Sequence, residues 1–486
     1  MKYLIVFFTA SITAFGAMTA FSATTSDTNP EKAGAEQQLQ DAWGKFAAGL
    51  AAAQASLTDP AAFPPEATDR NLAEGYRYML AHISRMIELE MRMDPQFPEF
   101  HRSMDMLRKW TAENPDTMYL KAPLDDTAFY KVTVTAEDTR EWRDSSRGLK
   151  KAKAPRMVTF QTVTDVPGAT GELAEMAACK SQTLAFLNAF DLQLDGDGFE
   201  VLIGPKRPKD YSGNFLPTQK TMTCQSTGKT AVAKARWLAV REIFSDWKFE
   251  EAMDMNIERL DSIGLTKAPI TPEFVAEKLA RMGEELPNQI RFWNLLMAFP
   301  LEFYEDANKD GRRNLPVNGI NPPAPPFTAG GVAGSRQLYA SGMYDLKEDE
   351  ALVVKVTAPV EPHYIGMQLG TPWFEGPDQQ NHVSSLTGHQ LPVASDGSRY
   401  YVISAFDPGV QGWVATTGYL YGQHAMRFIF REDPAADKMP TAEAFVVNRA
   451  QLASVLPADT PRISSEARRA EIAIRQSHIK KRWRAF

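Results

Sequence analysis

The sequence has few cysteines, no excess of positive charge and no long apolar run after its first twenty residues. Its 486 residues include two Cys and carry a formal net charge of −7. General nucleic-acid-binding proteins usually present a basic face, so this balance argues against a nucleic-acid partner. No later stretch approaches the roughly 20 apolar residues that span a bilayer. We therefore expect no integral membrane protein once the N-terminal segment is removed.

Complete catalytic motifs are also absent. The sequence contains no Gly-x-Ser-x-Gly, no Gly-x-x-x-x-Gly-Lys-Ser/Thr phosphate loop and no His-Glu-x-x-His. A nucleophilic Ser stays open, because catalytic triads are assembled in space rather than in sequence. The hydrophobic content of 44% and aromatic content of 10% indicate a packed globular protein rather than a disordered chain.

The N-terminus has the pattern of an export signal. Lys2 supplies a short positive region, residues 3–20 are apolar and uncharged, and small residues follow. Ala20 and Ser22 suit the −3 and −1 positions of a cleavage site after residue 22, with Ala23 as the alternative. We predict a signal peptide over residues 1–22 and a periplasmic or secreted protein. A retained N-terminal membrane anchor is the other interpretation.

The predicted export bears on whether the two cysteines form a disulfide. Cys179 and Cys224 are the only pair available, and an oxidising compartment favours joining them. In the chain-entropy model, closing a loop of this length stabilises the fold by roughly 4 kcal/mol. We predict this disulfide, and the alternative is two separate buried thiols.

The spacing of apolar residues divides the mature chain into helical and β regions. Residues 23–114 favour helices, and Asp69 stands where an N-cap would precede apolar residues at helical spacing. Residues 115–262 form a predicted first β domain. Its clearest strands, where β-branched residues alternate with others, are expected at residues 130–135, 157–163, 199–203 and 237–244.

The second half repeats this order. Linking helices are expected over residues 263–313, where Thr271 and Pro272 have the composition of a helix start. A second β domain is predicted over residues 314–440. A tail with a basic helix follows over residues 441–486, suited to packing on the acidic body of the protein or to an anionic partner. The predicted class is α+β, mainly β, with two antiparallel β domains.

Several segments resemble one family. Residues 114–119 read Asn-Pro-Asp-Thr-Met-Tyr, residues 213–217 read Gly-Asn-Phe-Leu-Pro, and residues 407–410 read Asp-Pro-Gly-Val. Together they resemble a bacterial exported family with paired domains of unknown function (the domain-of-unknown-function 1254 / 1214 family). The resemblance implies two jelly-roll-like β-sandwich domains with helical additions, assembled as a homo-oligomer, and carries no established reaction. Residues 370–373 depart from it, reading Gly-Thr-Pro-Trp where the family commonly has Asn-Arg-Trp.

The second β region concentrates rings, imidazoles and carboxylates, with four of the seven histidines. Loops at one end of a sandwich converge on a rigid frame. Glu375 and Asp407 suit the acid and base of glycosidic cleavage, with His424 as a third catalytic candidate. A histidine-bound transition metal, or residues that merely satisfy loops and turns, are the alternatives. Predicted ligand contacts are Trp373, His382, His389, Trp413, Tyr419 and Arg427.

One short motif resembles a calcium loop. Asp306, Asn308 and Asp310 stand at positions 1, 3 and 5, with Gly311 at position 6. Position 12 is Val317 rather than the bidentate Glu, so we expect weak calcium binding or an ordinary polar turn.

Two functions follow from these patterns. The first is an exported hydrolase or lyase acting on a glycan or similar small molecule. The second is a non-catalytic periplasmic ligand-binding or structural oligomer.

Overall fold

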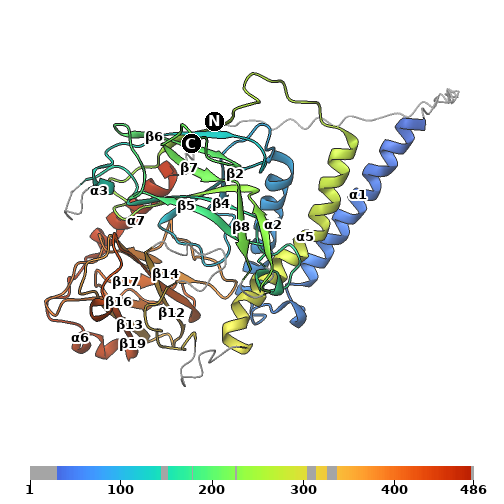
Figure 1. Cartoon of the computed structure of the whole chain (residues 1–486). Coiled ribbons are helices and arrows are strands. Elements are labelled where there is room, and N and C mark those ends of the chain that lie inside the picture. The colour runs from blue at the N-terminus through green and yellow to red at the C-terminus, as the bar shows by residue number, and fades with distance from the viewer. Residues whose placement is uncertain are drawn as a thin grey trace, which may run out of the picture.

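The computed structural model describes residues 30–143, 151–177, 179–224, 227–303, 314–325 and 336–482. The predicted signal peptide and the predicted calcium ligands Asp306, Asn308 and Asp310 lie outside these residues. The chain combines helices near both ends and in the middle with four main β-sheets (Figure 1). The α+β class predicted from the sequence is therefore confirmed.

Three long helices form one flank of the molecule. They are α1 (Pro30–Ala55), α2 (Asp69–Arg92) and α5 (Pro272–Ala298), and α1 and α5 run side by side (Figure 1). The close approach of α1 and α5 needs glycine, because a Cβ added at Gly49 would overlap the backbone of Gly283. Thr271 caps α5 as predicted, accepting a hydrogen bond from the amide of Phe274. The N-cap of α2 is Thr68 rather than Asp69, which is the first helical residue.

Two sheets enclose the first hydrophobic core. The first sheet has the order β1 (His101–Met104), β2 (Thr117–Pro123), β10 (Trp237–Ile243), β4 (Met157–Val163) and β5 (Thr183–Asn188). The second sheet has the order β11 (Asp254–Arg259), β3 (Tyr130–Thr135), β6 (Gly198–Gly204) and β7 (Asn214–Pro217). Alternate residues such as Leu120, Val132 and Phe160 point into this core, as the period of a strand requires.

Two further sheets enclose a second core. The third sheet has the order β12 (Gln337–Asp345), β18 (Tyr421–Ile429), β14 (Tyr364–Gly370) and β15 (Ser385–Thr387). The fourth sheet has the order β17 (Trp413–Ala415), β16 (Ser398–Ser404), β13 (Glu350–Thr357) and β19 (Thr441–Asn448). Leu352, Met367 and Phe428 are among the residues that fill the space between them.

Most strand pairs are antiparallel, but two are parallel. β6 pairs with β7 and β16 with β17 in parallel, so the second and fourth sheets are mixed rather than purely antiparallel. The remaining elements are short. They are the hairpin β8 (Gln219–Thr223) and β9 (Thr230–Lys234), the helices α3 (Arg140–Arg143), α4 (Ala174–Ala177) and α6 (Leu452–Val455), the 3-10 turns η1 (Pro60–Ala62), η3 (Ala436–Lys438) and η4 (Arg449–Gln451), and the π-helical turn η2 (Phe299–Phe303).

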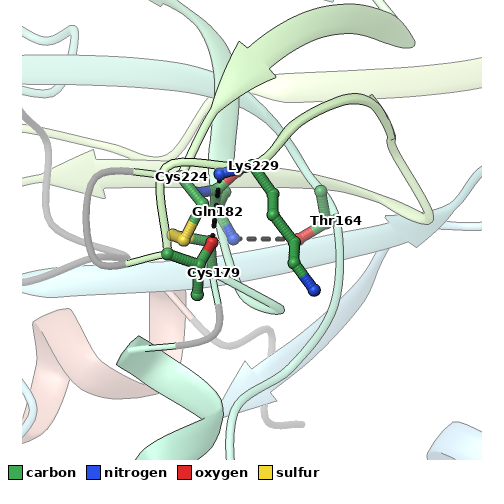
Figure 2. The surroundings of a disulfide bond; sticks show 6 residues. Thr164, Cys179, Gln182, Cys224 and Lys229 are labelled. Atoms are coloured by element: carbon green, nitrogen blue, oxygen red, sulfur yellow. Dashed lines mark hydrogen bonds between the residues drawn. A yellow bond between two sulfur atoms is a disulfide. The ribbon is translucent and has the colours of Figure 1, made fainter.

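The predicted disulfide is present. Cys179 and Cys224 are joined, with their Cα atoms 5.7 Å apart. Figure 2 shows that the bond ties the segment after α4 to the end of β8, where the amide of Cys224 donates to the carbonyl oxygen of Lys229. The bond thus anchors the exposed β8–β9 hairpin.

The last helix, α7 (Ser465–Arg482), lies against both pairs of sheets (Figure 1). Arg475 donates to the carbonyl oxygens of Gln379 and Ser385, beside the third sheet. Arg482 donates to the carbonyl oxygen of Pro115, just before β2 of the first sheet. None of the helices in the described part of the chain combines the length and apolar character that crossing a membrane requires.

Candidate functional site

One face of the first sheet points into the first core. The opposite face is polar, although it does not lie on the molecular surface. In β2 the residues Met118 and Leu120 point into the first core, so Tyr119 and Lys121 point to the opposite face. The strand register places Arg241 of β10 beside Tyr119 and Ala239 beside Lys121. On the other side of β10, Thr159 pairs with Arg241 and Gln161 with Ala239.

The third sheet presents a similar face. In β18 the residues Met426 and Phe428 belong to the second core, so Arg427 points away from it. Arg427 pairs with Tyr339 of β12 on one side and with Gly366 of β14 on the other. The guanidinium of Arg427 lies over the ring of Tyr339, 5.2 Å from its centroid.

These two faces meet. The Tyr364 hydroxyl donates to Asp116 Oδ2 at 2.6 Å, and Arg427 hydrogen-bonds with Tyr119 across the interface. We call the facing side chains the inter-sheet layer. Its members are Thr117, Tyr119, Lys121, Thr159, Gln161, Ala239 and Arg241 from the first sheet, and Tyr339, Tyr364, Ala425 and Arg427 from the third sheet.

The inter-sheet layer is incompletely filled. Ala239 and Ala425 lie on interior strands of their sheets, yet both are only partly buried. Lys121 and Arg427 also keep some accessible surface, although burial is the largest single influence on the pKa of each. Because these side chains keep accessible surface on a face that the third sheet covers, we infer a space between the two sheets over the central strand β10, called the hollow below.

Positive charge dominates this hollow. Burial and the neighbouring Arg85 and Arg241 lower the pKa of Lys121 from 10.5 to about 7, against a raising influence of Asp165. Arg241 Nη1 donates to Gln161 Oε1 at 2.9 Å, and its guanidinium lies 5.8 Å from the ring centroid of Tyr119.

Arg85 of α2 is a further cation near Lys121. Its guanidinium lies 3.0 Å from the ring centroid of Trp110 and donates to Gln289 Oε1 of α5. Burial lowers the pKa of Arg85 well below its ordinary value. No carboxylate in the described part of the chain forms an ion pair with Arg85, Lys121, Arg241 or Arg427.

Several buried polar atoms in and beside the inter-sheet layer have no partner among the described residues. They are Thr159 Oγ1, Gln161 Nε2, Arg427 Nε, and Nε and Nη2 of Arg85. Leaving a buried polar group without a hydrogen bond costs about 1–3 kcal/mol, so native proteins keep few such groups. A cluster of them around one hollow indicates space for water or for a ligand.

The edge of the inter-sheet layer is a rigid polar network. Asp116 is buried and accepts hydrogen bonds from Tyr364 and from Trp247 Nε1. Burial raises the pKa of Asp116, whereas these bonds and the charges of Arg475 and Arg482 lower it. The Asn-Pro-Asp-x-x-Tyr segment therefore supplies both this network and Tyr119 of the inter-sheet layer.

A small open pocket lies beside this network at α7. It has a volume of about 150 Å³ and is lined by Trp247, Glu250 and His478, among others. Ligand pockets usually measure roughly 300–1,000 Å³. This pocket is therefore smaller than the usual ligand pocket.

The predicted catalytic residues lie in separate settings. Glu375 is fully buried and pairs with Arg77 of α2. Burial is the main cause that raises its pKa to about 8, and Glu113 contributes. Asp407 accepts a hydrogen bond from the amide of Gly409 in its turn and pairs with Arg468 of α7.

His424 is buried in the second half of the molecule. Its Nε2 donates to the carbonyl oxygen of Gly319 at 2.9 Å, and burial lowers its pKa to about 4. It shares no hydrogen-bond or ion-pair partner with Glu375 or Asp407 among the described residues. Each of the three side chains therefore has contacts of its own, and their catalytic role stays a prediction.

The predicted ligand contacts are similarly dispersed. Trp373 packs on Tyr78 and donates to the carbonyl oxygen of Asn71, and Tyr419 lies under the guanidinium of Arg70. Three further side chains contact other groups or solvent: Trp413 donates to the carbonyl oxygen of Ser404, His389 contacts Arg156 and Ser245, and His382 is exposed.

Arg427 is the one residue of the predicted site that belongs to the inter-sheet layer. Tyr119 was part of the family-like motif, and Lys121 and Arg241 could be found from alternation in their strands. In the described residues no group of three His, Cys, Asp or Glu side chains could hold a metal ion.

Comparisons with known proteins support the fold. No protein-family model and no curated protein matches the chain. An uncharacterised protein of Burkholderia cenocepacia has a similar crystal structure, with a TM-score of 0.66 and 21% identity over 86% of this chain and 99% of that one. A protein of Vibrio parahaemolyticus aligns with a TM-score of 0.36 and 12% identity over 76% of this chain and 97% of that one. At these identities the first similarity concerns the fold alone.

Proposed function

We propose that the protein is an exported, non-catalytic binding protein that holds a small molecule in the inter-sheet layer. The observation that carries this proposal is the incompletely filled space between two polar sheet faces. Small side chains on interior strands leave room there, and buried donors and acceptors around it have no protein partner. A ligand that supplied those hydrogen bonds would remove an energetic cost that the free protein carries.

The residues that surround the inter-sheet layer suit ligand binding better than catalysis. The walls come from strands in the interior of two sheets, which are rigid, and the edge is fixed by the Asp116 network. The side chains that form the inter-sheet layer include no carboxylate, so the layer lacks the pair of carboxylates that glycosidic cleavage uses. The hydrolase or lyase predicted from Glu375, Asp407 and His424 stays a prediction.

The remaining expectations belong to the same proposal. We propose that each pair of sheets is a jelly-roll-like sandwich, that the protein works in the periplasm or outside the cell, and that it assembles as a homo-oligomer. The disulfide supports the location, because such bonds persist mainly in oxidising compartments.

A filling substitution tests the proposal. Ala239→Phe places a ring in the hollow, and Ala231→Phe, on the exposed strand β9, is the matched control. Overpacking a filled interior costs typically 1–3 kcal/mol. We expect Ala239→Phe to unfold within about 0.5 kcal/mol of the wild type, and to lose the thermal stabilisation that library compounds give the wild type. A compound whose stabilising effect survives Ala239→Phe binds elsewhere and would contradict the proposal.

A further inference from the structure

We infer that the ligand of the inter-sheet layer is a small anion, bound between Arg241 of the first sheet and Arg427 of the third sheet, with Lys121 beside them. This inference rests on the proposed function and adds the chemical class of the ligand. Its basis is a set of neighbouring cations with which no carboxylate of the described residues forms an ion pair.

The two arginines reach the same place from opposite sides. Arg241 approaches the ring of Tyr119, with its guanidinium 5.8 Å from the ring centroid. Arg427 hydrogen-bonds with the same tyrosine from the facing sheet. One tyrosine side chain thus separates two guanidinium groups. Lys121 lies two residues further along β2, on the same face as Tyr119, and adds a third positive group.

Several enclosed arginines of this protein pair with acids. Arg156 pairs with Glu141 and Glu250. Arg399 pairs with Glu361, and Arg468 pairs with Asp407 and Glu471. The buried Arg475 and Arg482 instead donate to backbone carbonyl oxygens. Arg241 and Arg427 have no carboxylate in ion-pair contact among the residues that the structure describes.

The missing counter-charge has an energetic meaning. Enclosed charges are costly unless they are paired and hydrogen-bonded. Like charges held close together add repulsion, and Arg241 is one of the groups that lower the pKa of Lys121. An anion in the hollow would remove both costs. Guanidinium groups suit carboxylate and phosphate oxygens in particular, because their donors form a planar fork.

The position between two sheets also limits the size of the ligand. The hollow lies between two sheets that are tied together at Asp116 and Tyr364, and its walls include the rings of Tyr119 and Tyr339. A polymer would need a continuous open groove. We therefore expect a small carboxylate or oxyanion with up to two charged groups, one for each sheet.

The test compares anions with an uncharged analogue of the same shape. Calorimetry and thermal shift at constant ionic strength would use inorganic phosphate, succinate and the neutral succinamide. We expect succinate or phosphate to bind saturably, with succinamide at least tenfold weaker. Arg241→Gln and Arg427→Gln should each weaken anion binding at least tenfold. Arg469→Gln, on the exposed face of α7, is the matched control and should leave binding unchanged.

A second measurement does not depend on the choice of probe. Without added anion, Arg241→Gln should unfold at the same temperature as the wild type or higher, because it relieves repulsion with Lys121. A clear loss of stability would show that Arg241 is a structural residue and would overturn the inference.

The failures of the two proposals are distinguishable. If uncharged compounds bind, lose their effect in Ala239→Phe and keep it in Arg241→Gln and Arg427→Gln, the site is real and the anionic class is wrong. If phosphate and succinate do not bind at 10 mM, the anionic class is also wrong. If every compound that binds keeps its effect in Ala239→Phe, the proposed function itself fails.

Discussion

Lys121 should destabilise the free protein near neutral pH, and replacing it should stabilise the fold. Its pKa lies at about 7 instead of the ordinary 10.5, because burial and the neighbouring Arg85 and Arg241 oppose its charge. The groups around it are cationic except for Asp165, and His101, its partner on β1, is held neutral with a pKa of about 3. We predict that Lys121→Met raises the free energy of unfolding at pH 6.

The magnitude follows from linkage between protonation and folding. One unit of pKa corresponds to about 1.4 kcal/mol, so the full lowering for Lys121 would cost about 5 kcal/mol. Lys121 keeps some accessible surface, which screens the charge, and we expect a gain of about 2 kcal/mol from Lys121→Met.

The pH dependence has a definite sign. The folded-state pKa of Lys121 lies below the unfolded-state value, so between pH 7 and pH 10.5 the unfolded chain binds more protons. The stability of the wild type therefore rises with pH across this window, as far as Lys121 is concerned. Below pH 7 the penalty is complete. The advantage of Lys121→Met should therefore shrink by more than half between pH 6 and pH 9.5.

Urea unfolding followed by tryptophan fluorescence at the two pH values measures this difference. Other groups that titrate in this range, such as Glu250 and Glu375, are common to both proteins and cancel in the comparison. Lys131→Met, on a partly exposed side chain paired with Glu200, serves as the control and should change stability by about 0.5 kcal/mol or less. A loss of stability in Lys121→Met at pH 6, or a difference that does not vary with pH, would refute the reasoning.

Three further predictions concern the disulfide, the Asp116 network and the binding site. Replacing Cys179 and Cys224 with Ala should lower the free energy of unfolding by about 4 kcal/mol for the 45-residue separation, and calorimetric melting that is unchanged would contradict a loop-entropy role. Asp116→Asn leaves Arg475 and Arg482 without their acid and should cost about 3 kcal/mol in urea unfolding, whereas a neutral result would show that the backbone carbonyls suffice. The affinity for sulfate should increase as the pH falls from 8.5 to 6, because Lys121 gains its proton; calorimetry showing the opposite trend would remove Lys121 from the site.

The sequence predicted local structure well where one pattern was enough. Alternating β-branched residues gave strands 130–135 and 157–163 with the observed bounds, because side-chain alternation is a property of the strand itself. The helix after Thr271 was predicted for the same reason, since a cap and a proline act within one turn. The disulfide followed from having two cysteines and an export signal.

The candidate site was harder to predict, because it depends on which faces meet. Lys121 and Arg241 lie on the polar side of amphipathic strands, and in sequence such residues are indistinguishable from those that face solvent. Only the packing of the first sheet against the third places them in an enclosed space. The reverse holds for His424 and Glu375. Their residue types suggested chemistry, yet the fold buries each against partners of its own.

Helix α7 has a consequence for how the proposed ligand would exchange. Arg475 and Arg482 bond segments from both sheet pairs to one helix, so the two halves cannot separate as rigid bodies while that helix stays bound. Under the proposed function, we expect exchange by rotation of a few bordering side chains. Residence time would then be governed by local fluctuations rather than by a large-scale opening motion.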